Sequence, residues 1–177
     1  MSRISTPESI ADAPEGSRAL LNAVNAQLGV TPNVFLVAAN SPAALESYVG
    51  TVGALAKGKL PRPTHERIAL AVAEANGCGY CLSAHTYLGK HVARLDDAEM
   101  IANRAGRSND SKADAAARFA RKVTETRGHV SDDDVRAVRD AGYDDAQIVE
   151  IVQHVALNTW TNYVNSVAKT EIDFPLV

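Results

Sequence analysis

The 177-residue sequence divides into segments whose apolar residues recur at helical spacing, separated by proline, glycine or asparagine. Amphipathic helices place apolar residues three or four positions apart, whereas half-buried strands alternate them. No segment alternates convincingly, and aromatic residues make up only 5% of the chain, which also disfavours sheet. We therefore predict an all-α helical bundle with helices at about 17–29, 41–58, 61–76, 78–91, 96–104, 112–127, 132–141 and 144–168.

The length of the chain is typical of one compact domain and is too short to expect two. Residues 1–15 contain two prolines and little periodicity, so we expect an extended N-terminal arm. Residues 16–177 should then form the single domain. Within it, Thr31-Pro32-Asn33 is expected to form a turn between the first two helices.

Composition and charge exclude several classes of function. The net charge is −3 and no Lys/Arg cluster stands out, so nucleic acid is not an expected partner. No run of about 18 apolar residues occurs, which argues against a membrane span. The start, Met1 to Pro7, lacks the apolar core of a signal peptide, so we expect a cytoplasmic protein.

The chain has two cysteines, and both lie in the stretch Gly77 to His85. If a helix begins near Cys78, then Cys81 and His85 are four residues apart and share one face. The helix dipole favours a thiolate at Cys78, whereas the neighbouring imidazole favours one at Cys81. These residues alone therefore leave open which of the two cysteines would act as a nucleophile.

Three interpretations of this C-x-x-C-x-x-x-H arrangement compete. Free cysteines are often simply buried in a core. Two thiolates and an imidazole could instead supply three ligands to zinc, but the chain has no further cysteine to complete a structural site. The third interpretation is redox chemistry, in which one thiol attacks a peroxide and the other closes a disulfide. The spacing and the reducing compartment favour this third interpretation.

A proton relay needs a carboxylate near the histidine, and two glutamates precede the cysteines. Glu66 lies on an otherwise apolar helix face that leads toward the cysteine helix, whereas Glu74 shares its face with Arg67. A carboxylate on an apolar face is costly unless it has a partner or a use. Glu66 is therefore the better candidate, although Arg62 or Arg67 could pair with either acid.

A row of polar residues follows the expected last helix at near-helical spacing: His154, Asn158, Asn162 and Asn165. This row could line the pocket of an active site. It could equally make hydrogen bonds across a helix or subunit interface, and the sequence leaves both interpretations open.

The pattern E-x11-C-x2-C-x3-H formed by Glu66, Cys78, Cys81 and His85 resembles that of alkylhydroperoxidase D (AhpD) and the wider carboxymuconolactone decarboxylase-like family. The most specific match runs from Glu66 to Gly89. More diffuse similarity to the peroxidase-related branch of the family lies at residues 31–35, 41–45 and 162–165.

This resemblance implies an AhpD-like helical fold with a redox core at about 60–92, assembled as a homotrimer or homohexamer. It also implies hydroperoxide reduction without a cofactor or metal. By this resemblance Cys81 is the attacking thiolate, Cys78 is the resolving thiol, and Glu66 and His85 form the proton relay. Electrons would come from a dithiol donor such as a lipoylated or thioredoxin-like protein.

One position departs from the AhpD pattern. AhpD has a histidine just before the second cysteine, where this chain has Tyr80. A tyrosine, with an ordinary pKa of about 10, cannot shuttle protons near neutrality as imidazole does. Two alternatives to a peroxidase therefore stay open: a decarboxylase- or isomerase-type enzyme on the same fold, and a dithiol redox sensor.

Overall fold

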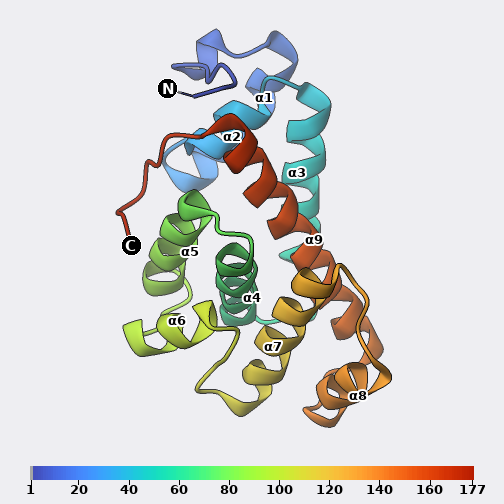
Figure 1. Cartoon of the computed structure of the whole chain (residues 1–177). Helices are drawn as coiled ribbons and strands as arrows, with labels where there is room; N and C mark the ends of the chain where they lie inside the picture. Colours follow the sequence, from blue (N-terminus) through green and yellow to red (C-terminus); the bar gives the residue numbers. More distant parts are fainter. Residues whose placement is uncertain (1) are drawn as a thin grey trace.

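The computed structural model describes residues 2–177, and these residues form α-helices, one short 3₁₀ turn and no strand (Figure 1). The predicted all-α, single-domain architecture is therefore confirmed. In chain order the elements are η1 (Ile10–Asp12), α1 (Glu15–Leu28), α2 (Asn33–Ala38), α3 (Pro42–Leu55), α4 (Arg62–Ala75), α5 (Gly79–His91), α6 (Asp97–Arg104), α7 (Ser111–Thr126), α8 (Asp132–Asp140) and α9 (Asp145–Ala168).

Helix α4 lies at the centre of the bundle and packs against α5, α6, α7 and α9 (Figure 1). The run Ile68–Ala73 is fully enclosed by these neighbours, because it consists only of aliphatic and alanine side chains. A helix that is apolar on nearly all sides is stable only when it is surrounded by protein. The carboxylate of Glu66, two residues before this run, is carried into the same interior.

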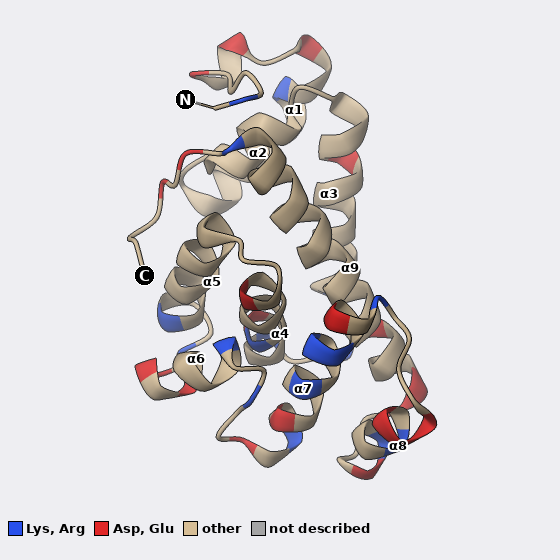
Figure 2. Ribbon diagram, in the orientation of Figure 1, with Lys and Arg blue, Asp and Glu red and all other residues tan. Residues whose placement is uncertain are grey.

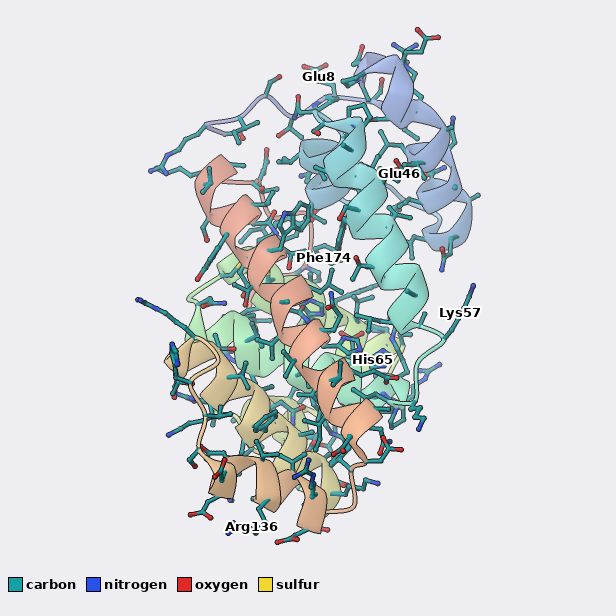
Figure 3. The ribbon with its side chains drawn as sticks, turned by 90° about the vertical axis from the view of Figure 1, so that its right-hand side faces the viewer. Glu8, Glu46, Lys57, His65, Arg136 and Phe174 are labelled. Atoms are coloured by element: carbon teal, nitrogen blue, oxygen red, sulfur yellow. The ribbon has the colours of Figure 1, made fainter. Side chains whose placement is uncertain are left out.

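The long helix α9 crosses the molecule and contacts α2, α3, α4, α5 and α7. Its N-terminus is closed by a capping box, in which Asp144 accepts from the Gln147 N–H and Gln147 accepts from the Asp144 N–H. Helices α3 and α9 lie next to each other on one face of the molecule (Figure 3). This path brings the C-terminal helix into contact with the cysteine-bearing helix α5.

The turn between α4 and α5 places Cys78 at the start of its helix. Gly77 has φ +65°, a left-handed conformation that glycine adopts without the strain of a Cβ atom. The Cys78 N–H donates to the Ala73 carbonyl at 2.9 Å and the Gly77 N–H to the Glu74 carbonyl at 3.1 Å. This is a Schellman ending, and the predicted break at Asn76-Gly77 is correct.

The sequence does not predict helix α2, because Thr31-Pro32-Asn33 indicates only a turn. The structure instead forms one and a half turns of helix directly after Pro32, and it buries Val34, Leu36 and Val37. Six residues are too few to establish a helical period in the sequence. The short helix is held by its neighbours, since isolated helices of this length are unstable.

Charged side chains are unevenly distributed over the surface. Figure 2 shows them gathered on α6, α7 and α8, whereas α3 and the C-terminal part of α9 carry very few. Residues 151–168 contain no Lys, Arg, Asp or Glu. No helix of the described chain, residues 2–177, combines the length and apolar character needed to cross a bilayer.

Candidate active site

The four residues predicted for the site lie together where α4 and α5 meet. Glu66 Oε2 is 2.8 Å from His85 Nδ1, and the two sulfur atoms of Cys78 and Cys81 are 2.7 Å apart. Both cysteines are free thiols and are almost fully buried. The helix–turn–helix connection therefore converts four positions spread over 20 residues into one cluster of titratable groups.

The glutamate and the histidine form an ion pair in which the carboxylate is buried and the imidazole is partly buried. Burial favours the neutral form of both groups, but their hydrogen bond and mutual attraction outweigh it, so the pKa of Glu66 is lowered and that of His85 is raised. Arg62 Nε donates to the other carboxylate oxygen of Glu66 at 3.2 Å. This pairing favours the imidazolium form of His85, and the thiolate charge of Cys81 also raises the histidine pKa.

The two thiols are not equivalent. A hydrogen bond with Cys78 lowers the pKa of Cys81; burial opposes this effect, while the charge of His85 and two asparagine amides reinforce it. The same sulfur–sulfur contact, together with burial, raises the pKa of Cys78. The Cys78 sulfur also caps α5 by accepting the Cys81 N–H at 3.3 Å. Cys81 is therefore the sulfur on which negative charge is best stabilised.

Two asparagines of α9 belong to this cluster. Asn165 Nδ2 donates to the Cys81 sulfur at 3.4 Å, and the amide of Asn162 also acts to lower the pKa of Cys81. The other two residues of the polar row do not bond to the sulfur, although the charges of Glu66 and His85 still act on the pKa of His154. His154 stacks on His65, with ring centroids 4.2 Å apart, and the Asn158 amide donates to the His154 carbonyl. His65 lies against α9 in Figure 3.

Tyr48 is a neighbour of the site that sequence reasoning missed. Burial raises the pKa of its hydroxyl, and the nearby charges of Cys81 and Glu66 raise it further, so it remains a neutral phenol. Its ring lies between Phe35, at 5.0 Å, and Trp160, at 5.1 Å between centroids. No motif could have revealed this, because these three aromatic residues come from three different helices.

Tyr80, which replaces the histidine of the AhpD pattern, contacts α2 and the C-terminal segment. Its hydroxyl accepts the Val34 N–H at 3.2 Å, and its ring packs edge-on against Phe174. Burial raises its pKa, and the neighbouring carboxylate of Asp173 also raises it. Its hydroxyl is therefore directed toward α2 and the C-terminal segment, and it does not bond to either cysteine.

The other candidate carboxylate, Glu74, is paired with an arginine of α6 and not with His85. It accepts a hydrogen bond from Arg104 at 2.6 Å, and its side chain is 38% exposed. Glu66 alone of the two candidates contacts the histidine of the motif. Within the described part of the chain, no three His, Cys, Asp or Glu side chains converge as they would around a metal ion.

The model of the carboxymuconolactone decarboxylase family matches residues 42–126, the segment that contains Glu66, both cysteines and His85. A solved AhpD-core structure, an uncharacterized peroxidase-related protein from Ralstonia eutropha JMP134, superposes with a TM-score of 0.85. The alignment covers 97% of this chain and 92% of that chain at 24% identity. The resemblance to the AhpD-like family is confirmed.

Further solved structures share this AhpD-like fold. A peroxidase-related protein from Silicibacter sp. TM1040 has a TM-score of 0.81, 23% identity and coverage of 97% of this chain and 94% of its own. A variant of the debrominase Bmp8 in complex with 2,3,4-tribromopyrrole also has a TM-score of 0.81, with 20% identity and coverage of 98% and 94%. No curated protein sequence matches the chain significantly. At these identities the solved structures establish the fold and not the reaction.

Proposed function

We propose that the protein is a thiol-dependent hydroperoxide reductase in which Cys81 is the attacking group. The observation that carries this proposal is the convergence on one sulfur of a second thiol, an amide and an imidazole that is paired with a carboxylate. The Cys81 sulfur lies 2.7 Å from Cys78, 3.4 Å from Asn165 Nδ2 and beside His85, whose pKa is raised by Glu66. A thiolate stabilised in this way reacts near neutral pH.

In the proposed reaction, a lone pair of the Cys81 thiolate attacks the distal oxygen of R–O–O–H. The S–O bond forms as the O–O bond breaks, which leaves a sulfenic acid on Cys81 and an alkoxide. The alkoxide takes the proton of the His85 imidazolium and leaves as the alcohol R–OH. Glu66 stabilises the imidazolium beforehand, as a carboxylate paired with a general acid does.

The enzyme then returns to its resting state in two further steps. The Cys78 sulfur attacks the sulfenic sulfur, releasing water and forming a Cys78–Cys81 disulfide. The thiols already touch, so this closure needs only a small movement. An external dithiol, such as a lipoylated or thioredoxin-like protein, supplies the two electrons that reduce the disulfide by exchange.

The surroundings of the sulfur favour an organic hydroperoxide over hydrogen peroxide. The ring of Tyr48 lies beside the Cys81–Glu66 cluster and between the rings of Phe35 and Trp160. These aromatic surfaces offer apolar contact to an alkyl or aryl group attached to the peroxide. We expect cumene hydroperoxide to react faster than hydrogen peroxide for this reason.

The decisive experiment measures turnover and the chemical state of the sulfurs together. Reduced protein is mixed with cumene hydroperoxide and analysed by intact mass, and consumption of peroxide is then followed with a dithiol. Loss of two thiols per chain within the monomer, with catalytic turnover, is the expected result. Disulfide formation without turnover would support a redox sensor, and unreactive thiols would favour a decarboxylase- or isomerase-type enzyme.

Association into a homotrimer or homohexamer is part of the same proposal. Four large apolar side chains on one face of α9 are 42–68% exposed: Val149, Val152, Tyr163 and Val167. Their positions repeat at the spacing of a single helix face. Because the neighbouring stretch of α9 lacks charged residues, a second copy of the chain could cover this face without desolvating a charge.

A further inference from the structure

Two buried polar atoms beside the Cys81 sulfur have no hydrogen-bond partner among the described residues: Asn162 Nδ2 and Asn165 Oδ1. Asn162 is fully buried and Asn165 is 4% exposed. Buried polar groups are nearly always paired, because an unpaired one loses its hydrogen bonds to water without replacement. An unpaired donor and an unpaired acceptor next to the same sulfur therefore require an explanation.

Each of these two amides has one end that is hydrogen-bonded or in contact with the sulfur, and this identifies the end that is unpaired. Asn76 Nδ2 donates to Asn162 Oδ1 at 2.9 Å. The Asn162 NH₂ group is therefore the end that lowers the pKa of Cys81, and it does so without forming a hydrogen bond to any described residue. Asn165 Nδ2 donates to the Cys81 sulfur, so the Asn165 carbonyl oxygen is the unpaired end. The next polar residue on the same face, Asn158, is not in this state, because its amide donates to the His154 carbonyl. Among the described residues three other buried atoms also lack a partner, Asn103 Oδ1, His154 Nε2 and Thr170 Oγ1. Asn162 and Asn165 differ from these because their amides act on the pKa of Cys81.

We infer that Asn162 and Asn165 bind the –O–O–H group of the substrate over Cys81, which rests on the function proposed above. A hydroperoxide has one hydrogen-bond donor, on its distal oxygen, and accepts hydrogen bonds at both oxygens. The free carbonyl of Asn165 accepts the O–H, which places the distal oxygen next to the attacking sulfur. The free NH₂ of Asn162 donates to the proximal oxygen.

This arrangement assigns the two asparagines different tasks in one step. As the S–O bond forms and the O–O bond breaks, negative charge develops on the proximal oxygen. A donor already directed at that oxygen stabilises the developing charge, as in an oxyanion hole. The Asn162 amide performs this task until the oxygen receives the His85 proton.

The test separates peroxide binding from simple stabilisation of the thiolate. In a Cys78→Ser background only the Cys81 thiol remains, and its rates of reaction with tert-butyl hydroperoxide and with iodomethane are measured by intact mass. Iodomethane has no hydrogen-bond donor or oxygen, so its rate reports the amount and nucleophilicity of the thiolate. The informative quantity is the ratio of the two rates at one pH.

Asn165→Leu and Asn162→Leu should each lower this ratio on the order of ten- to hundredfold. The aspartate variants test the accepting role of Asn165 and the donating role of Asn162 separately. Asn165→Asp keeps the acceptor and should keep the ratio even if its charge slows both reactions. Asn162→Asp keeps the acceptor for Asn76 but loses the free donor, so its ratio should fall. Gln153→Met, which removes an exposed amide from the same helix, is the matched control.

If every asparagine variant lowers both rates by the same factor, the asparagines only stabilise the thiolate and the inference is wrong, while the proposed function stands. If the parent protein reacts with iodomethane but not with the hydroperoxide, the proposed function itself fails and the inference falls with it. Circular dichroism identifies any variant that does not fold. The results at positions 162 and 165 are interpreted independently, and Asn162→Asp retains the acceptor for Asn76.

Discussion

The carboxylate of Glu66 raises the pKa of His85, although it makes no hydrogen bond to either sulfur atom. Its substitution by glutamine keeps the shape but removes the charge that offsets the burial of His85. The pKa of His85 should then fall, and the rate of Cys81 oxidation by cumene hydroperoxide at pH 7 should drop about 100-fold or more. Stopped-flow measurements on Glu66→Gln test this, with Glu74→Gln on the same helix as the control.

The pH dependence of the same reaction follows from the two shifted groups. The rate should rise as Cys81 ionises, at a pH below that of an ordinary thiol, and fall as His85 loses its proton, at a pH above that of an ordinary histidine. In Glu66→Gln the alkaline limb should move to lower pH. An unchanged profile and wild-type rates between pH 6 and 9 would contradict the roles assigned to Glu66 and His85.

Tyr80 is expected to stabilise the fold and not to transfer protons. Tyr80→Phe removes the oxygen that accepts the Val34 N–H and leaves that buried donor unpaired. The free energy of unfolding should therefore fall by about 1–2 kcal/mol, measured by urea denaturation. The rate of Cys81 oxidation should stay at the wild-type value. A large loss of rate with little loss of stability would instead place the tyrosine in the relay.

At the scale of whole elements, a second buried carboxylate joins α4, α6 and the segment before α7. Glu99 accepts hydrogen bonds from Arg67 at 2.6 Å, Asn103 at 3.0 Å, Ser108 Oγ at 2.5 Å and the Asn109 N–H at 2.7 Å. Burial alone would raise its pKa, but these donors lower it to about 2. The carboxylate thereby fixes the position of α4, and with it that of Glu66.

Glu99→Gln should lower the free energy of unfolding by about 3 kcal/mol, because it leaves the guanidinium of Arg67 without its charged partner. A lowered carboxylate pKa contributes stability above the unfolded pKa of about 4.3 and loses it as the pH falls. The difference between wild type and variant should therefore shrink from pH 5 toward pH 3. Glu125→Gln, which breaks an exposed ion pair with Arg121, should have little effect at any pH.

At the scale of the whole molecule, the apolar face of α9 predicts association with further copies of the chain. Tyr163→Glu places a charge within this face and should convert a trimer or hexamer into smaller species, measured by light scattering after size exclusion. Ile101→Glu is the matched control, because Ile101 is 70% exposed on α6, away from the face. A monomeric wild-type protein at micromolar concentration would contradict the proposal.

The sequence by itself determined the features that depend on neighbouring positions. The helical class, the break at Gly77, the long last helix and the i, i+4 relation of Cys81 and His85 all follow from periodicity and capping. The choice of Glu66 over Glu74 could also be predicted, because the apolar face around Glu66 implies burial. These features are local, so the spacing of residue types is enough to predict them.

Only the tertiary structure decided which distant side chains surround the sulfur. Asn165 is separated from Cys81 by 84 positions, and Tyr48 reaches the site from a third helix. Tyr80 is adjacent to Cys81 in sequence, yet its hydroxyl binds the backbone of α2. Each of these outcomes depends on how α9, α3 and α2 pack around α4 and α5. Such packing results from many weak contacts summed over the whole chain, which no single motif encodes.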